Sequence, residues 1–283
     1  MGLIYIALSV VCSLTIAHFI KLSNKGSARL INVLVINYLV AFLISLTISR
    51  NEFTQCVFSE PMLLIFTIVL GTIFIANLFI YSESLNRIGM GISISAMRMS
   101  LVIPIGVSLF VYGETIHQFK YVGIVLVFVA LYLMVPKTNS TRLKDIRDSI
   151  YPILLFLMTG IADASLKVFQ REYSTHIPEY GFLGLIFFSS FIIGSVYLFT
   201  KKELNFSKKE IFYGIIIGVA NLYSSFFLLL ALQETEGSIV FSLTNVSNVV
   251  LGSIIGFLVW KDELSTLQKL GILLATISIL LLI

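Results

Sequence analysis

The sequence predicts an all-α integral membrane protein in which ten transmembrane helices form two inverted five-helix repeats around a central cavity. Three observations lead to this fold: the composition, the apolar segments that recur along the whole chain, and an internal repeat. Of the 283 residues, 58% are hydrophobic and only 12% are charged, and the mean hydropathy is +1.00. Soluble domains carry about 25% charged residues, so the composition excludes an ordinary soluble protein.

Apolar segments follow one another along the chain. They span residues 2–20, 30–49, 61–82, 91–112, 117–135, 151–172, 179–199, 211–232, 237–259 and 266–283. Because an α-helix rises about 1.5 Å per residue, each of these segments is long enough to cross a hydrocarbon core of about 30 Å. The first segment has its basic residues after it rather than before it, unlike a signal peptide, so we expect it to remain as a helix.

The basic residues predict the orientation of the chain. Fourteen of the nineteen lie in or beside the loops that follow odd-numbered segments: Lys21, Lys25, Arg29, Arg87, Lys137, Arg142, Lys144, Arg147, Lys201, Lys202, Lys208, Lys209, Lys261 and Lys269. Lys and Arg are retained on the cytoplasmic side during insertion. We therefore expect these loops in the cytoplasm, both termini extracytoplasmic, and a location in the bacterial inner membrane. Topology accounts for the basic clusters, so no nucleic-acid partner is expected.

The chain repeats itself after a polar linker. We predict a first five-helix repeat at 1–136, a basic linker at 137–150 and a second repeat at 151–283. Setting Gly123 against Gly271 aligns YGETIHQFKYVGIVL with WKDELSTLQKLGILL. Because an odd number of spans precedes it, the second repeat must enter the membrane from the opposite side. Inverted repeats of this kind are typical of secondary transporters.

Several short motifs resemble those of the drug/metabolite transporter superfamily, in its ten-span EamA type. They are the lysine that ends the first segment in AHFIKLSNK, Pro104 in SAMRMSLVIPIGVSLF, and YGE followed nine residues after Glu114 by a glycine. The second half departs from the family pattern with Gly252 in place of a proline and Asp262 in place of a glutamate. The resemblance covers nearly the whole chain. It implies a ten-helix bundle with a central cavity, and export or exchange of small metabolites.

Ionisable residues within the apolar segments are the first candidates for function, because each costs about 2.5 to 3.5 kcal/mol at a helix centre. Asp163 lies deepest, and we expect it to bind a coupling proton or cation. A structural ion pair with Lys167, four residues later, is the alternative. Arg98 is expected to bind an anionic group of the substrate, since its planar guanidinium can present two parallel donors to a carboxylate; the alternative is a structural tie within the bundle.

Further polar residues are predicted to face the pathway. The expected substrate-binding residues are Arg98, Asn245, Asn248, His18, Lys21, Lys167, Asn77 and Tyr81. His18 and Lys21 are three apart, so they share a helix face and would line the inner half with Arg98, although Lys21 could instead snorkel to the membrane edge. Asp163 and Lys167 would line the outer half. For Asn245 and Asn248, the alternative is hydrogen bonding between helices.

Some residues have a simpler structural interpretation. Gly214 and Gly218 have the GxxxG spacing that lets helices approach closely, and we expect them at a packing contact inside the bundle. Glu114, in the YGETIH turn, is expected to cap the following helix, the fifth of the chain.

These observations predict a secondary transporter of small organic metabolites, such as amino acids or other carboxylate-bearing compounds, that works by alternating access. The alternatives are proton-coupled efflux of cationic drugs and a membrane sensor that does not transport. The three histidines fall in separate segments without a spacing such as HExxH, so no enzyme, metal or cofactor is expected. The expected partners are a small-molecule substrate, a coupling proton and the lipid bilayer, and the chain is expected to act as a monomer.

Overall fold

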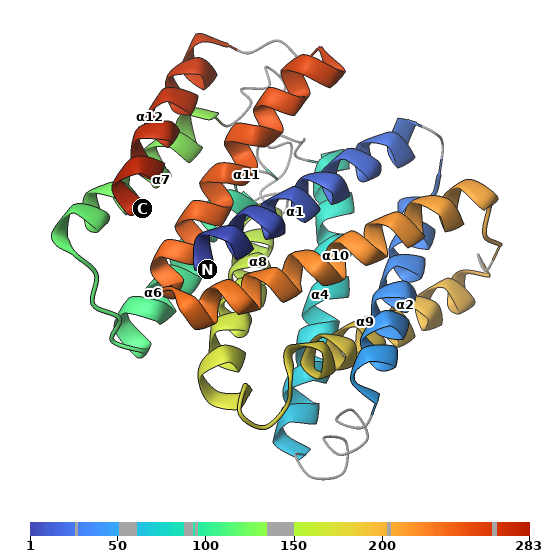
Figure 1. Cartoon of the computed structure of the whole chain (residues 1–283). Helices are drawn as coiled ribbons and strands as arrows, with labels where there is room; N and C mark the ends of the chain where they lie inside the picture. Colours follow the sequence, from blue (N-terminus) through green and yellow to red (C-terminus); the bar gives the residue numbers. More distant parts are fainter. Residues whose placement is uncertain are drawn as a thin grey trace. The chain divides into compact units, whose positions relative to one another are not determined.

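The computed structural model describes residues 1–25, 28–50, 61–87, 93, 96–134, 150–202, 205–261 and 265–283. These residues form helices joined by turns, with no β-strand among them (Figure 1). The helices are α1 (Gly2–Lys25), α2 (Leu30–Ile48), α4 (Pro61–Arg87), α6 (Val102–Gly106), the π-helix η1 (Val107–Val111), α7 (Gln118–Met134), α8 (Ile150–Val168), the π-helix η3 (Phe169–Tyr173), α9 (Glu179–Lys201), α10 (Lys208–Glu234), α11 (Gly237–Trp260) and α12 (Thr266–Leu282). The all-α prediction is confirmed for these residues.

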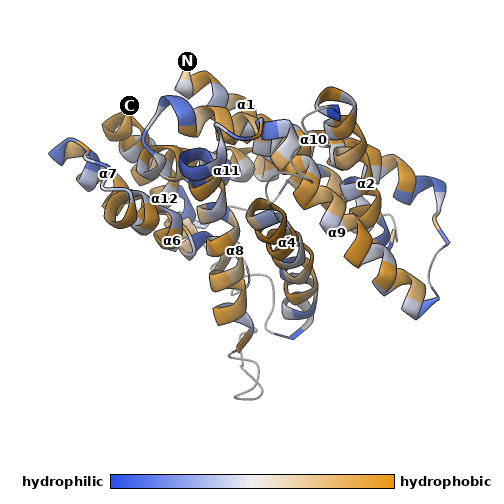
Figure 2. Cartoon of the chain, turned by 90° about the horizontal axis from the view of Figure 1, so that it is seen from below, coloured by the Kyte–Doolittle hydropathy of each residue, from blue (hydrophilic) through white to orange (hydrophobic). Residues whose placement is uncertain are grey.

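Most of these helices consist mainly of hydrophobic residues (Figure 2). Within the described residues, seven are long and apolar enough to cross a membrane: Gly2–Ser23, Leu30–Ile48, Pro61–Tyr81, Ile150–Tyr173, Glu179–Lys201, Lys208–Glu234 and Gly237–Val259. Shorter apolar helices occupy Ala96–Val111, Gln118–Met134 and Thr266–Leu282. This succession of long apolar helices indicates an integral membrane protein.

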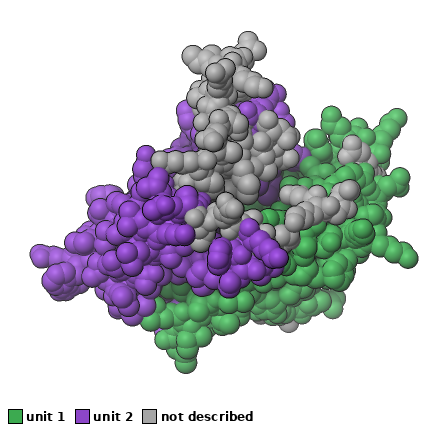
Figure 3. Space-filling model, turned by 90° about the horizontal axis from the view of Figure 1, so that it is seen from above, with its two compact units in different colours: residues 1, 3–75, 168–230 green, residues 2, 76–167, 231–283 purple. Residues whose placement is uncertain are grey.

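The chain forms two compact units (Figure 3). Unit 1 comprises Met1, Leu3–Ile75 and Val168–Leu230, and unit 2 comprises Gly2, Ala76–Lys167 and Ala231–Ile283. Each unit takes helices from both of the repeats expected at 1–136 and 151–283. A compact unit in space and a repeat in sequence are different properties, so the division into repeats stays a prediction. Most of the expected linker, at 137–149, lies outside the described residues.

In unit 1, α4 packs closely against α9. Gly71 makes this contact possible, because a Cβ atom added to it would lie 2.5 Å from the Cβ of Ser189 and 2.9 Å from the carbonyl oxygen of Ile186. Helix α9 also packs against α2, where the rings of Tyr38 and Phe187 stack with centroids 6.1 Å apart.

Helix α10 of unit 1 packs against α2 through two glycines. A Cβ atom added to Gly214 would lie 2.6 Å from the Cβ of Ile36. One added to Gly218 would lie 2.7 Å from the carbonyl oxygen of Asn37 and 2.8 Å from the Cβ of Val40. The packing role predicted for this GxxxG pair is therefore confirmed.

In unit 2, α7 and α12 lie side by side and antiparallel (Figure 1). A Cβ atom added to Gly123, near the start of α7, would lie 3.0 Å from Leu282 at the end of α12. One added to Gly271, near the start of α12, would lie 2.5 Å from Met134 at the end of α7. Helix α11 packs against both of these helices and against α6.

The ends of several helices have specific caps. Helix α12 starts with a capping box, in which the hydroxyl of Ser265 accepts from the backbone N–H of Gln268 while the Gln268 side chain accepts from the backbone N–H of Ser265. Helices α9 and α11 end at Lys202 and Lys261, whose left-handed conformations have φ of 56° and 58°. Gly113, with φ of 62°, supplies the left-handed position in the turn before α7.

Candidate functional site

Seven of the nine residues predicted to bind substrate or a coupling ion lie in unit 2. They are Asn77 and Tyr81 on α4, Arg98 just before α6, Asp163 and Lys167 on α8, and Asn245 and Asn248 on α11. His18 and Lys21 belong to unit 1, where both lie on α1. Four stretches of chain therefore supply the candidate site of unit 2.

Arg98 is the residue around which this site is built. Its Nη1 donates to Oδ1 of Asn245 at 3.3 Å, and Nδ2 of Asn245 donates in turn to the carbonyl oxygen of Phe241 at 3.1 Å. The second bond holds the amide so that its oxygen faces the guanidinium. Arg98 also interacts electrostatically with Asp163 and Tyr81. Polar groups from α4, α8 and α11 thus converge on one cation.

The residues of this site are not completely buried. Arg98, Asp163 and Asn245 are each half-buried. An ionised group removed from water within apolar helices would carry a large desolvation cost. The polar neighbours Asn245 and Asp163 offset part of this cost for Arg98. A guanidinium has five N–H donors, more than the contact with Asn245 uses, so Arg98 has donors to offer an anion.

Asn77 links two helices of unit 2. Its Nδ2 donates to Oγ1 of Thr159 at 3.1 Å, across the contact between α4 and α8. Thr159 is four residues before Asp163, so this bond fixes α4 against the turn of α8 that leads to the carboxylate. The contact is an interhelical hydrogen bond of the expected kind. Substrate contact by Asn77 stays a prediction.

Two buried acceptors lie on one face of α11. Oγ1 of Thr244 and Oδ1 of Asn248 have no hydrogen-bond partner among the described residues. The two residues are four positions apart, so they are neighbours on the helix surface. An unsatisfied buried polar atom costs about 1 to 3 kcal/mol, and a water or ligand that donated to it would remove this cost. Asn245, with its bond to Arg98, lies directly after Thr244 in sequence.

Lys167 pairs with the carboxylate of Glu114, whereas its four-residue spacing in the sequence suggested Asp163. Its Nζ lies 2.8 Å from Oε1 of Glu114, and the two side chains are only 1% and 2% exposed. The same carboxylate accepts from the backbone N–H groups of Gly237 at 2.8 Å and Ser238 at 3.1 Å. The expectation that Glu114 caps the following helix, α7, is therefore wrong: it caps the N-terminus of α11.

The pKa of Glu114 reflects this setting. Burial by itself raises the pKa of a carboxyl group, but the hydrogen bonds from Lys167, Gly237 and Ser238 and the charge of Lys167 outweigh burial. The pKa of Glu114 therefore lies below the ordinary value of 4.5, and its carboxylate is ionised at neutral pH.

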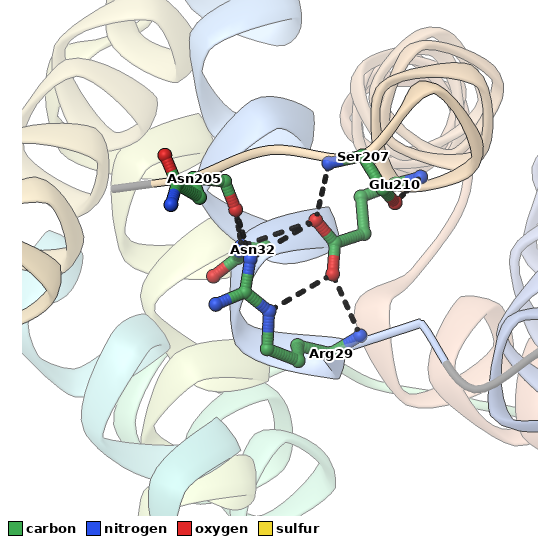
Figure 4. Close-up of polar contacts among 5 residues, drawn as sticks. All are labelled: Arg29, Asn32, Asn205, Ser207 and Glu210. Atoms are coloured by element: carbon green, nitrogen blue, oxygen red, sulfur yellow. Dashed lines mark hydrogen bonds and ion pairs between the residues drawn. The ribbon is translucent and has the colours of Figure 1, made fainter. Parts of the chain in front are cut away.

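Unit 1 contains another bound carboxylate, that of Glu210 (Figure 4). Glu210 is 3% exposed and accepts from the backbone N–H of Arg29 at 3.0 Å, from Nε of Arg29 at 3.1 Å, from Asn32 at 3.2 Å and from the backbone N–H of Ser207 at 2.8 Å. Arg29 and Asn32 also donate to the carbonyl oxygen of Asn205. This cluster fastens the start of α2 to the start of α10. The sequence suggested only a topological role for Arg29.

His18 and Lys21 are half-buried on α1 of unit 1. The ring of His18 packs edge-on against that of Phe19, with centroids 5.6 Å apart. In the same unit, Nδ2 of Asn221 donates to Oδ1 of Asn37 at 3.1 Å and so links α10 to α2. The roles of His18 and Lys21 in substrate binding stay predictions.

Comparison with known proteins agrees with these features. Residues 150–283 match the EamA-like transporter family. A protein of Haemophilus influenzae (strain ATCC 51907 / DSM 11121 / KW20 / Rd), described as uncharacterized, is 26% identical over 286 residues, which cover 96% of this chain and 94% of the relative. A solved structure described as "Crystal structure of protein" shares the fold with a TM-score of 0.74 at 9% identity, over 99% of this chain and 95% of the other.

The family match confirms the resemblance that the motifs suggested, and it is consistent with the drug/metabolite transporter superfamily. The matched family is one of membrane transporters of small molecules, in agreement with the long apolar helices of this chain. Residues 150–283 of this protein are thus similar to the EamA-like transporter family.

Proposed function

We propose that the protein is a secondary transporter that exports or exchanges small organic metabolites bearing a carboxylate, such as amino acids, by alternating access across the bacterial inner membrane. The observation that carries this proposal is the half-buried Arg98, which lies among apolar helices with Asn245 and Asp163 as its polar neighbours. A charge at that position is costly in a membrane protein and is therefore a functional candidate. The transporter family matched by residues 150–283 supports the class of function.

In this proposal the fold consists of ten spans in two inverted repeats, with the cavity between them. Support comes from reciprocal contacts in unit 2. Gly123 meets Leu282, and Gly271 meets Met134. Gly271 lies as far after Gly123 along the chain as Leu282 lies after Met134. The same contact therefore occurs twice between α7 and α12. In one copy the glycine lies on α7 and its neighbour on α12, and in the other copy the glycine lies on α12 and its neighbour on α7.

Unit 1 has a second reciprocal set of contacts. Gly71 of α4 meets Ser189 and the carbonyl oxygen of Ile186 on α9, and Gly218 of α10 meets the corresponding groups on α2. Those groups are Val40 and the carbonyl oxygen of Asn37, which have the same three-residue spacing. Reciprocal contacts between antiparallel helices are what a twofold axis perpendicular to the helices produces. For helices that cross a bilayer, this axis lies in the membrane plane, as in inverted-repeat transporters.

The proposed site binds the carboxylate of the substrate at Arg98. A guanidinium can donate two parallel hydrogen bonds to a carboxylate. Asp163 binds the coupling proton or cation, and the acceptors of Thr244 and Asn248 receive donors from the substrate or from water. Tyr81, which interacts electrostatically with Arg98, completes this side of the site.

The remaining candidates have positions along the proposed pathway. His18 and Lys21 line its inner half, Lys167 supports its outer half through the buried pair with Glu114, and Asn77 supports α8. The chain acts as a monomer with both termini extracytoplasmic.

A binding panel tests the substrate class. Purified wild type and an Arg98→Gln variant are heated with amino acids, other carboxylates, sugars, phosphorylated metabolites and organic cations, and the shift in Tm is measured. We expect carboxylates to stabilise the wild type and to lose this effect in Arg98→Gln. Asn221→Ala, which alters a polar contact of unit 1, is the matched control and should keep the response. Stabilisation by organic cations alone, lost in Asp163→Asn, would instead support efflux of cationic drugs.

A sensor that does not transport would bind the same ligands. It would not exchange labelled ligand across a proteoliposome membrane, so a counterflow assay separates the two functions. A bound but unexchanged ligand would contradict the proposal.

A further inference from the structure

We propose that Glu114 and Lys167 form a charge latch that holds the N-terminus of α11 against the end of α8, and that this latch opens and closes during the transport cycle. The link to the cycle rests on the proposed function, whereas the latch itself does not. The latch consists of the carboxylate of Glu114, the ammonium group of Lys167 and the backbone N–H groups of Gly237 and Ser238.

The latch joins elements that are far apart in sequence. Glu114 follows the π-helix η1, Lys167 lies at the end of α8, and Gly237 begins α11. Gly237 lets these elements meet, because a Cβ atom added to it would lie 2.4 Å from Oγ of Ser108 and 3.1 Å from Cδ of Lys167. The stem of the lysine thus lies directly on the backbone of α11.

The charges in the latch are unequal in importance. The ammonium group of Lys167 and the positive end of the α11 dipole both face the carboxylate of Glu114. Neutralising Glu114 would leave two positive groups facing each other in a buried site. Neutralising Lys167 would leave a carboxylate that is still held by two backbone N–H groups. The loss of Glu114 should therefore open the latch, and the loss of Lys167 should not.

Two features point to a contact that can come apart. Oγ of Ser108 and Oγ of Ser238 lie beside the latch, fully buried and without a hydrogen-bond partner among the described residues. Opening would let these hydroxyl groups reach water and would remove the cost of leaving them unsatisfied. In addition, a π-helix adjoins each half of the latch, since η1 ends shortly before Glu114 and η3 begins shortly after Lys167. π-Helices are rare and occur frequently at functional sites.

The latch is on the same helices as the candidate substrate site. Lys167 is four residues after Asp163 on α8, and Gly237 is eight residues before Asn245 on α11. A movement of the start of α11 away from α8 would therefore also change how Asn245 meets Arg98. Substrate binding and latch opening act on one pair of helices.

Thiol labelling of Ser108→Cys measures latch opening directly. The native cysteines are first replaced by Cys12→Ala and Cys56→Ala, and the purified protein is treated with a hydrophilic maleimide. We expect slow labelling with the latch intact and labelling faster by about tenfold or more with Glu114→Gln, because the buried ammonium group of Lys167 then loses the carboxylate that faces it. Lys167→Met should stay within about threefold of the parent, and the double variant Glu114→Gln/Lys167→Met should return toward the parent rate, since the remaining cation is removed.

Controls separate the latch from general loosening of the fold. Glu83 pairs with Arg87 at 2.5 Å on an exposed helix face, so Glu83→Gln should leave labelling unchanged. Ser238→Cys, at an equally buried hydroxyl of the latch, serves as a second reporter if Ser108→Cys does not fold. Unchanged labelling in Glu114→Gln, or no rescue by the double variant, would overturn the latch.

Counterflow in the same variants tests the role in the cycle. Glu114→Gln should lower exchange by about tenfold or more, the double variant should restore part of it, and ligand-induced Tm shifts should persist. Normal exchange in Glu114→Gln would overturn this role. If the labelling rates follow the expected pattern but no carboxylate is exchanged, the latch is supported and the proposed function is contradicted.

Discussion

At the scale of single residues, the polar groups of unit 2 fall into two sets with different chemistry. Arg98 and Asp163 are half-buried and keep accessible surface, whereas Glu114 and Lys167 are almost completely buried and bind each other. The first set is the one proposed to bind the ligand. The second set holds backbone and side chains in place.

Asp163 should couple transport to a proton or cation. We expect Asp163→Asn to abolish the dependence of uptake on an imposed pH gradient, because an amide cannot take up and release a proton. Expression and Tm should change little, since the position retains its size and partial exposure. Uptake into proteoliposomes at a series of pH gradients measures this effect. A wild-type response to the gradient in the variant would remove the coupling role.

Glu114 should contribute strongly to stability. We expect Glu114→Gln to lower the free energy of unfolding by about 3 to 5 kcal/mol at neutral pH, since it removes the ionised carboxylate that lies 2.8 Å from the buried ammonium group of Lys167. The pKa of Glu114 is depressed below 4.5, so its contribution is complete above pH 4.5 and is lost as the pH falls through the folded-state pKa.

Thermal unfolding of wild type and Glu114→Gln from pH 8 downward tests this prediction. The difference in Tm should stay constant at pH values above 4.5 and shrink below it. A difference that is already shrinking at neutral pH would mean that Glu114 is not held as an ionised group.

At the scale of helices, close contacts between backbones depend on glycine. Gly218→Ala would place a Cβ atom 2.7 Å from the carbonyl oxygen of Asn37, which belongs to the backbone of α2 and cannot rotate away. We expect Tm to fall by several degrees, with a loss of about 1 to 3 kcal/mol from overpacking.

Gly106→Ala is the matched control for this substitution. Gly106 lies in α6, and the nearest atom to an added Cβ is 4.0 Å away. Alanine has the higher helix propensity, so this variant should keep or slightly raise Tm. An equal loss of Tm in both variants would show that the close packing of α10 on α2 does not determine the stability of the protein.

The helices of this protein could be predicted because each is a long apolar run. Within the described residues, an apolar helix lies in each of the predicted segments. The partners of polar residues could not be predicted in the same way. Glu114 binds Gly237, which lies 123 positions further along the chain, and no local pattern shows which helix N-terminus a carboxylate will reach.

Part of the candidate site could also be predicted from the apolar character of the helices. Arg98, Asp163 and Asn245 stand out in sequence because charged and amide groups are rare in apolar helices, and the structure brings them together. The buried pair of Lys167 depends on tertiary contacts, and its sequence spacing to Asp163 suggested a different partner.

At the scale of the whole molecule, the orientation of the chain follows from the basic loops. We expect a reporter enzyme fused after Ile283 to be active outside the cytoplasm, because Lys and Arg concentrate in the loops assigned to the inside. A paired alkaline phosphatase and fluorescent protein fusion measures this, with a fusion in the linker at 137–150 as the control of opposite sign. A cytoplasmic signal after Ile283 would reverse the orientation.

The central claim is that Arg98 binds the carboxylate of a transported metabolite. Counterflow in proteoliposomes tests it most directly: vesicles loaded with an unlabelled carboxylate that stabilises the protein are placed in a trace of the labelled compound, for wild type and Arg98→Lys. We expect transient accumulation in wild type and at least about a tenfold weaker apparent affinity in Arg98→Lys, because a point charge replaces a planar pair of donors. Equal affinities, or no accumulation in wild type for any carboxylate that binds, would contradict the claim.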